Sequence, residues 1–155
     1  MAKNWTIQPA LIGKAGEALA AAELMRRGVV VAVPAYDRGI DFLAYRADHF
    51  DLPIRVVPVQ VKARSGSAYT FQKSWFSIGG IALVQIWNEY STPEFYVFST
   101  LAEMEDALGE HAKSDSWLKD GGYSATTPSK RDLALMVPHR NRWDRILRQL
   151  DTIAD

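Results

Sequence analysis

The stretch RGIDFLAYRADHFDLPIRVVPVQVKARSG, residues 38–66, joins two apolar segments through a short polar connection. The second segment carries Gln60 and Lys62 two positions apart. Side chains of a strand alternate between its faces, so these two share one face while Val59 and Val61 point to the other. A polar pair on one face of an otherwise apolar strand indicates either a solvated edge or a functional site.

The pattern of the chain around this stretch predicts a mixed α/β domain. A helix is predicted over residues 9–28, because Pro9 suits a first helical turn and Gly28 is a typical stop. Apolar and β-branched runs predict strands over 29–36, 39–46, 54–63, 81–88 and 94–99. Pro58 predicts a bulge, or a position without a partner on its N–H side. Further along we expect a short helix over 101–109, a polar loop over 110–131, a strand over 132–138 and an amphipathic helix over 141–154.

Composition limits the possible classes of protein. A chain of 155 residues predicts a single domain, residues 1–155, with a real core. The 18 basic and 18 acidic residues cancel, so overall charge does not indicate a nucleic-acid partner, although a local basic patch can act in a neutral chain. Cysteine is absent, which excludes disulfides, thiolate catalysis and Cys-ligated zinc. The apolar runs are too short to span a bilayer, and the first residues lack the apolar core of a signal peptide, so we expect a cytoplasmic protein.

Three polar features converge on one chemistry. Glu17 lies in a stripe of small residues on the first helix, Asp41 heads the second strand, and Gln60 and Lys62 share a face of the third. An acid and an amide oxygen on adjacent strands can hold a hard cation such as Mg²⁺. A lysine beside such an ion can stabilise charge on a phosphate or help to lower the pKa of an attacking water. For Glu17 the alternative is a partly exposed acid in an ion pair with Lys14 or with a neighbouring element.

The segments GKAGE, GIDFLA and VQVKA together resemble the PD-(D/E)XK nuclease superfamily, over roughly residues 9–100. The resemblance implies a restriction-endonuclease-like fold, a mixed sheet flanked by helices, with a site for Mg²⁺ or Mn²⁺. It assigns the following roles: Asp41 the main metal ligand, Gln60 the second ligand, the carbonyl of Val61 a further ligand, Lys62 the catalytic lysine, and Glu17 the helix acid that orients the water or binds a second ion. Gln60 replaces the usual acid, as in Mrr-type restriction enzymes and some Holliday-junction-resolvase relatives, so the site has one carboxylate fewer.

The resemblance therefore implies a metal-dependent endonuclease that hydrolyses phosphodiester bonds in DNA. DNA is the expected partner, a second copy in a homodimer is a further candidate partner, and no membrane is expected. One alternative is a degenerate member of the fold that binds nucleic acid or a protein partner without cleaving, which the neutral charge and Gln60 favour. Another is a structural subunit or immunity-type protein, in which Lys62 and Asp41 form a buried ion pair.

Several other residues have two interpretations. Residues 69–78, with Lys62 and Arg64, form either a basic and aromatic surface for phosphates and bases or a segment whose aromatics pack into the core. The arginines near the C-terminus are expected on a solvated helix face rather than at phosphates: Arg142, Arg145 and Arg148. The three histidines are scattered singly and are expected to be surface or structural residues: His49, His111 and His139. Asp37, four residues before Asp41, is either an acid that supports the metal ligands or a turn residue beside Gly39, and the turn is favoured.

Overall fold

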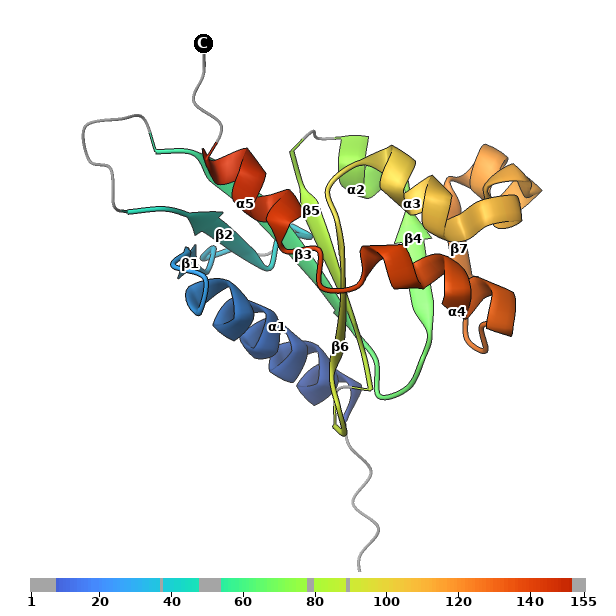
Figure 1. Cartoon of the computed structure of the whole chain (residues 1–155), viewed down its shortest axis with the longest axis horizontal. Coiled ribbons are helices and arrows are strands. Elements are labelled where there is room, and N and C mark those ends of the chain that lie inside the picture. Colours follow the sequence, from blue (N-terminus) through green and yellow to red (C-terminus); the bar gives the residue numbers. More distant parts are fainter. Residues whose placement is uncertain (1–7, 37, 48–53, 78–79, 89, 152–155) are drawn as a thin grey trace, which may run out of the picture.

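The computed structural model describes residues 8–36, 38–47, 54–77, 80–88 and 90–151 (Figure 1). Its main sheet has five strands in the order β1-β2-β3-β5-β6. These strands are β1 (Val30–Ala32), β2 (Phe42–Tyr45), β3 (Val56–Ala63), β5 (Ala82–Trp87) and β6 (Glu94–Phe98). β3 and β5 pair in parallel, and every other pair in the sheet is antiparallel. The sheet is therefore mixed, as predicted.

The two faces of this sheet are covered by different elements (Figure 1). Helices α1 (Pro9–Met25) and α5 (Asp144–Asp151) cover one face, where their apolar residues share a core with those of β3 and β5. A two-stranded sheet of β4 (Tyr69–Gln72) and β7 (Gly122–Ala125) lies on the other side with helices α2 (Ser74–Ser77), α3 (Leu101–Leu108) and α4 (Lys130–Met136). The short turns η1 (Gly109–Lys113), η2 (Ser116–Asp120) and η3 (Val137–His139) connect these elements. The fold is α/β, a mixed sheet flanked by helices, which confirms the predicted class.

Strand β3 places its side chains as the alternation predicts. Val59 and Val61 belong to the core beneath α1 and α5. Gln60 and Lys62 lie on the opposite face, next to Leu83 and Gln85 of β5. Pro58 pairs with Leu43 of β2, but the pairing of β3 with β5 begins only at Val59. Pro58 therefore has no partner on the β5 side, which agrees with the second of the two predictions made for it.

The region after α3 differs from the prediction. The expected loop over 110–131 contains strand β7, and the expected strand over 132–138 is helix α4 followed by a turn. The Ser129 hydroxyl accepts from the N–H of Asp132, while the Asp132 carboxylate accepts from the N–H of Ser129. This reciprocal capping begins a helix, and it outweighs the apolar run that suggested a strand. β4 was also absent from the predicted strands, and its partner β7 is far along the chain.

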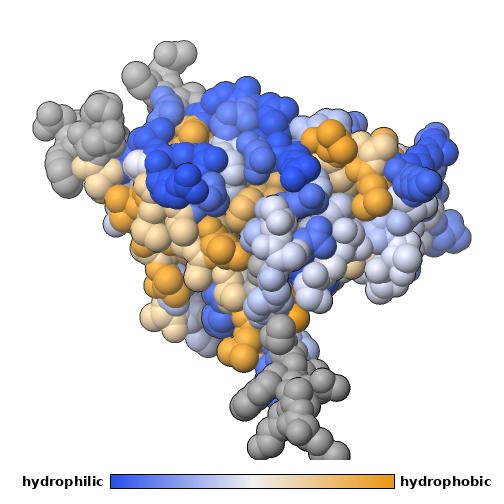
Figure 2. Space-filling model, turned by 60° about the horizontal axis from the view of Figure 1, so that its bottom comes forward, coloured by the Kyte–Doolittle hydropathy of each residue, from blue (hydrophilic) through white to orange (hydrophobic). Residues whose placement is uncertain are grey.

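Helix α1 is largely apolar on its outer side (Figure 2), as it is on its inner side. Its buried residues Gly16, Ala20 and Leu24 face the sheet. On the outer side Leu11 is 59% exposed and Met25 is 54% exposed. The helix ends at Met25, and Gly28 follows with a φ of +77°, a conformation that favours glycine.

Arg145 is buried, which contradicts the expected solvated arginine face. Its guanidinium donates to the carbonyl of Val97 (2.6 Å), hydrogen-bonds the Nδ1 of His139 (2.8 Å) and pairs with Glu103 (3.0 Å). A buried arginine is tolerated when its donors are paired in this way. Arg142 and Arg148 do lie at the surface, where both pair with Asp144. The network of Arg145 fastens α5 to β6 and α3.

The Arg145 network leads to a prediction about acid stability. Burial and the neighbouring Arg145 guanidinium lower the pKa of His139 to about 4. In the unfolded chain a histidine titrates near pH 6.5, so between about pH 6.5 and 4 the unfolded state binds a proton that the folded state does not. The free energy of unfolding should therefore fall as pH drops through this window, by roughly 3 kcal/mol from this histidine.

Urea unfolding at pH 7 and pH 4.5 measures this change. His139→Asn keeps a side-chain acceptor for Arg145 but cannot titrate, so its stability should fall less over the same interval. An identical loss in both proteins would show that other groups cause the acid sensitivity.

Candidate functional site

Asp41 lies directly before β2 and rests on the backbone of β3. Its N–H donates to the carbonyl of Val59 at 2.9 Å. One oxygen of its carboxylate accepts from the N–H of Val61 at 2.6 Å. Val61 lies between Gln60 and Lys62 in the strand, so the carboxylate sits beside the peptide that joins the predicted polar pair. The structure thus brings Asp41 to the segment that carries Gln60 and Lys62.

The turn that leads to Asp41 runs past the side chain of Gln60. Gly39 has a φ of +83°, where a residue with a Cβ is strained. A Cβ built on Gly39 would lie 3.5 Å from Nε2 of Gln60. The glycine therefore allows the turn that delivers Asp41 to β3 beside the amide of Gln60.

Gln60 is the unusual residue of this group. It is only 4% exposed, and its Oε1 is buried without a hydrogen-bond donor. Leaving a buried acceptor unsatisfied costs about 1–3 kcal/mol, so the atom calls for an explanation. Amide, carbonyl and carboxylate oxygens are the ligands of hard divalent cations. Gln60 Oε1, the Asp41 carboxylate and the Val61 carbonyl are a donor set that fits one such cation.

Lys62 is half-buried and close to an aromatic ring. Its Nζ lies 5.4 Å from the centroid of the Trp75 ring, over its face. An aromatic face attracts an ammonium but does not neutralise its positive charge. The contact that the structure describes for the Lys62 ammonium is the face of this ring. The charge of Lys62 is therefore available to a ligand at this face of β3.

Glu17 is paired within helix α1. Its carboxylate pairs with Nζ of Lys14 at 2.7 Å, the alternative considered from the sequence. Helix α1 packs on the face of β3 that carries Val59 and Val61, opposite to Gln60 and Lys62. Among the described residues no three histidines or acids gather as a metal site. A cation here would depend on Asp41, Gln60 and the Val61 carbonyl.

Trp75 contacts Lys62, but the sequence did not assign it to the predicted metal site. The signal for it was the mixture of basic and aromatic residues over 69–78. Tyr69 and Phe71 of that segment are buried in the second core, so for them the core interpretation is right. Trp75 is half-buried, with one face toward Lys62.

Two of the histidines have structural partners. His111 hydrogen-bonds Asp132 at 2.9 Å, and His139 bonds Arg145. His49 and Asp37 lie outside the described residues.

Comparisons with known proteins give a likeness of fold. No protein-family model and no curated protein matches the sequence. Among solved structures, the chain is similar to a bacterial homing endonuclease, with a TM-score of 0.54 and 18% sequence identity. The match covers 94% of this chain and 95% of the endonuclease chain, so the two share a fold over nearly their whole length. Within the described part of the chain, no helix is long and apolar enough to cross a membrane.

Proposed function

We propose that the protein is a metal-dependent endonuclease of the PD-(D/E)XK type that hydrolyses phosphodiester bonds in DNA. The observation that carries the proposal is the Asp41 carboxylate on the N–H of Val61, the residue that separates Gln60, whose Oε1 is unsatisfied, from Lys62. The fold shared with a bacterial homing endonuclease supports it.

The residues of the site have distinct roles in this proposal. Asp41, Oε1 of Gln60 and the carbonyl of Val61 would hold Mg²⁺ or Mn²⁺, which supplies positive charge beside the scissile phosphate and acidifies a water. Lys62 places its ammonium against the phosphate oxygens and stabilises the charge that develops there. Glu17 takes part, by orienting the water or binding a second ion, only when its ion pair with Lys14 opens.

A cleavage panel tests the proposal. Linear, nicked, branched and single-stranded DNA, and matching RNA, are incubated with Mg²⁺ or Mn²⁺, with EDTA as the control. We expect cleavage of at least one DNA substrate that depends on the added ion. Intact substrates throughout would reject the nuclease.

A second candidate function is favoured by the small number of acids at the site. Asp41 is the single carboxylate of the donor set, Gln60 is neutral, and Glu17 is paired with Lys14. A member of the fold that binds nucleic acid or a protein partner without cleaving would have such a site. Fluorescence anisotropy with labelled duplex DNA separates the two, since a non-cleaving DNA-binding member binds the duplex and leaves it intact in Mg²⁺.

Replacing Gln60 by Glu should tighten Mg²⁺ binding. The change adds one negative charge at a ligand position with almost no change in size. Repulsion from Asp41 and desolvation offset much of the added attraction, so we expect about a tenfold gain in affinity, about 1.4 kcal/mol. Calorimetric titration of both proteins with Mg²⁺ measures it.

Gln149→Glu is the matched control. It adds the same charge on α5, which packs on the opposite face of the sheet, and should leave Mg²⁺ affinity unchanged. Equal affinities for the wild type and Gln60→Glu would mean that Gln60 does not face a metal.

A further inference from the structure

The β4–β7 ribbon presents a row of uncharged polar side chains on its outer face. Tyr69 and Phe71 of β4 point inward and are buried. The alternate residues Thr70 and Gln72, with Ser124 of β7, point outward; Gln72 and Ser124 are exposed and Thr70 is half-exposed. Thr70 and Ser124 stand opposite each other, with their hydroxyl oxygens 3.0 Å apart.

We propose that this outer face, Thr70, Gln72 and Ser124, reads base edges in the major groove of DNA. The inference rests on the proposed function and adds to it the element that selects the cleaved sequence. The major groove, about 12 Å wide, admits a two-stranded ribbon. Alternate residues of a strand are roughly 6.8 Å apart, the rise of two base-pair steps, so Thr70 and Gln72 match bases two steps apart.

The chemistry of the row suits bases better than phosphates. A glutamine amide donates and accepts at once, which matches the N6 and N7 atoms of adenine, and a hydroxyl bonds to any base. None of the three side chains is charged. They would therefore contribute discrimination between sequences rather than general attraction to DNA.

The ribbon is attached to the strands that carry the candidate site. The Nε2 of Gln85 donates to the carbonyl of Thr70 at 2.7 Å, and Gln85 is the neighbour of Lys62 in the sheet. Trp75, over which the Lys62 ammonium lies, follows Gln72 by three positions. The ribbon that would contact the bases is thus joined through Gln85 to the strand that carries Lys62.

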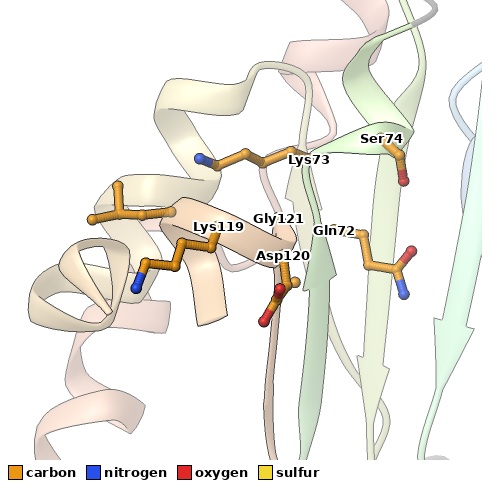
Figure 3. Close-up of a pocket in the computed structure, with 8 residues that line it drawn as sticks. Gln72, Lys73, Ser74, Lys119, Asp120 and Gly121 are labelled. Carbon is orange, nitrogen blue, oxygen red and sulfur yellow. The ribbon is translucent and has the colours of Figure 1, made fainter. Parts of the chain in front are cut away.

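A hollow of about 440 Å³ at the end of the ribbon is lined by two lysines, Lys73 and Lys119 (Figure 3). Their ammonium groups are candidates to contact the phosphates next to the bases that the ribbon reads. In Figure 3, Gln72 and Ser74 point to one side of β4, and Lys73 and Lys119 to the other. Nζ of Lys73 lies 5.1 Å from the centroid of the Trp117 ring, so its charge is not neutralised there. Lys119 pairs with Asp115, and Asp120 adds an acid to the lining, so Lys73 is the cation of this end that would meet a phosphate beside the ribbon, off the face that would read the bases.

A selection by binding tests the ribbon without requiring cleavage. A library of duplexes with a randomised segment is mixed with the full chain in Ca²⁺, and the bound fraction is sequenced. We expect the wild type to enrich a preferred sequence. In Gln72→Ala, the preference for one base over the others at one position should fall roughly tenfold. Lys73→Ala should instead weaken binding to all sequences alike and reduce its salt dependence.

Gln149→Ala, on the opposite side of the sheet, is the control and should keep the wild-type preference. The inference is overturned if the wild type binds without preference, if it binds no duplex, or if Gln72→Ala and the double variant Thr70→Ala/Ser124→Ala keep the wild-type preference. Cleavage of the same library in Mg²⁺ distinguishes these results from failure of the nuclease itself, because cutting without preference leaves the proposed function intact.

Discussion

Replacing Asp41 by Asn should abolish metal-dependent cleavage while the protein stays folded. The amide oxygen of Asn can still accept from the N–H of Val61, so the contact that seats the side chain on β3 survives. The charge that attracts the cation is lost. A bound cation stabilises the transition state by several kcal/mol, so we expect the rate to fall by at least ~10³-fold.

Two measurements check this result. Cleavage rates in Mg²⁺ give the loss, and thermal unfolding with and without Mg²⁺ reports binding apart from activity. The ion should raise the melting temperature of the wild type by linkage and leave that of Asp41→Asn unchanged. Asp106→Asn, which removes an exposed acid from α3, should behave as the wild type. A wild-type rate in Asp41→Asn would remove Asp41 from the mechanism.

Replacing Lys62 by Ala should lower the rate of cleavage by about 10²- to 10³-fold, the usual loss for a group that stabilises developing charge. The ammonium lies at the face of Trp75, which leaves its positive charge to act on a ligand bound there. Calorimetric Mg²⁺ binding should survive, since lysine is not a ligand. The combination of lost rate and retained metal binding distinguishes Lys62 from Asp41.

A matched pair of variants controls for lost packing. Lys73 also lies over a tryptophan ring, so Lys73→Ala should cost about as much stability as Lys62→Ala. Lys113→Ala removes an exposed lysine paired with Glu110 and should leave cleavage unchanged. If Lys62→Ala stays folded and leaves the rate unchanged, Lys62 has no role in the chemistry, and if it unfolds a protein that no metal affects, the buried ion pair is the better interpretation.

Local patterns determined most of the elements and the position of the polar pair. The ends of α1 follow from Pro9 and Gly28, because proline and glycine constrain the backbone whatever surrounds them. The separation of Gln60 and Lys62 from Val59 and Val61 follows from the alternation of a strand. Helix α4 is predictable too, because the Ser129 and Asp132 cap lies within four residues and determines the backbone more strongly than the apolar run that begins at Asp132.

Contacts between distant segments could be decided only by the tertiary structure. The partner of β4 is β7, with Thr70 and Ser124 54 positions apart, and no local pattern identifies such a pair. Arg145 is buried because Glu103, His139 and the Val97 carbonyl surround it, although its spacing matches an exposed helix face.

The candidate site shows the same division. The residue types on each strand follow from local pattern: Asp41 before β2, Gln60 and Lys62 on one face of β3. The tertiary structure decided what each polar group meets: Asp41 the N–H of Val61, Lys62 the ring of Trp75, Glu17 the ammonium of Lys14, and Oε1 of Gln60 no donor. Backbone periodicity fixes the direction of a side chain locally, whereas its partner depends on which segments the packing of the core brings within hydrogen-bonding distance.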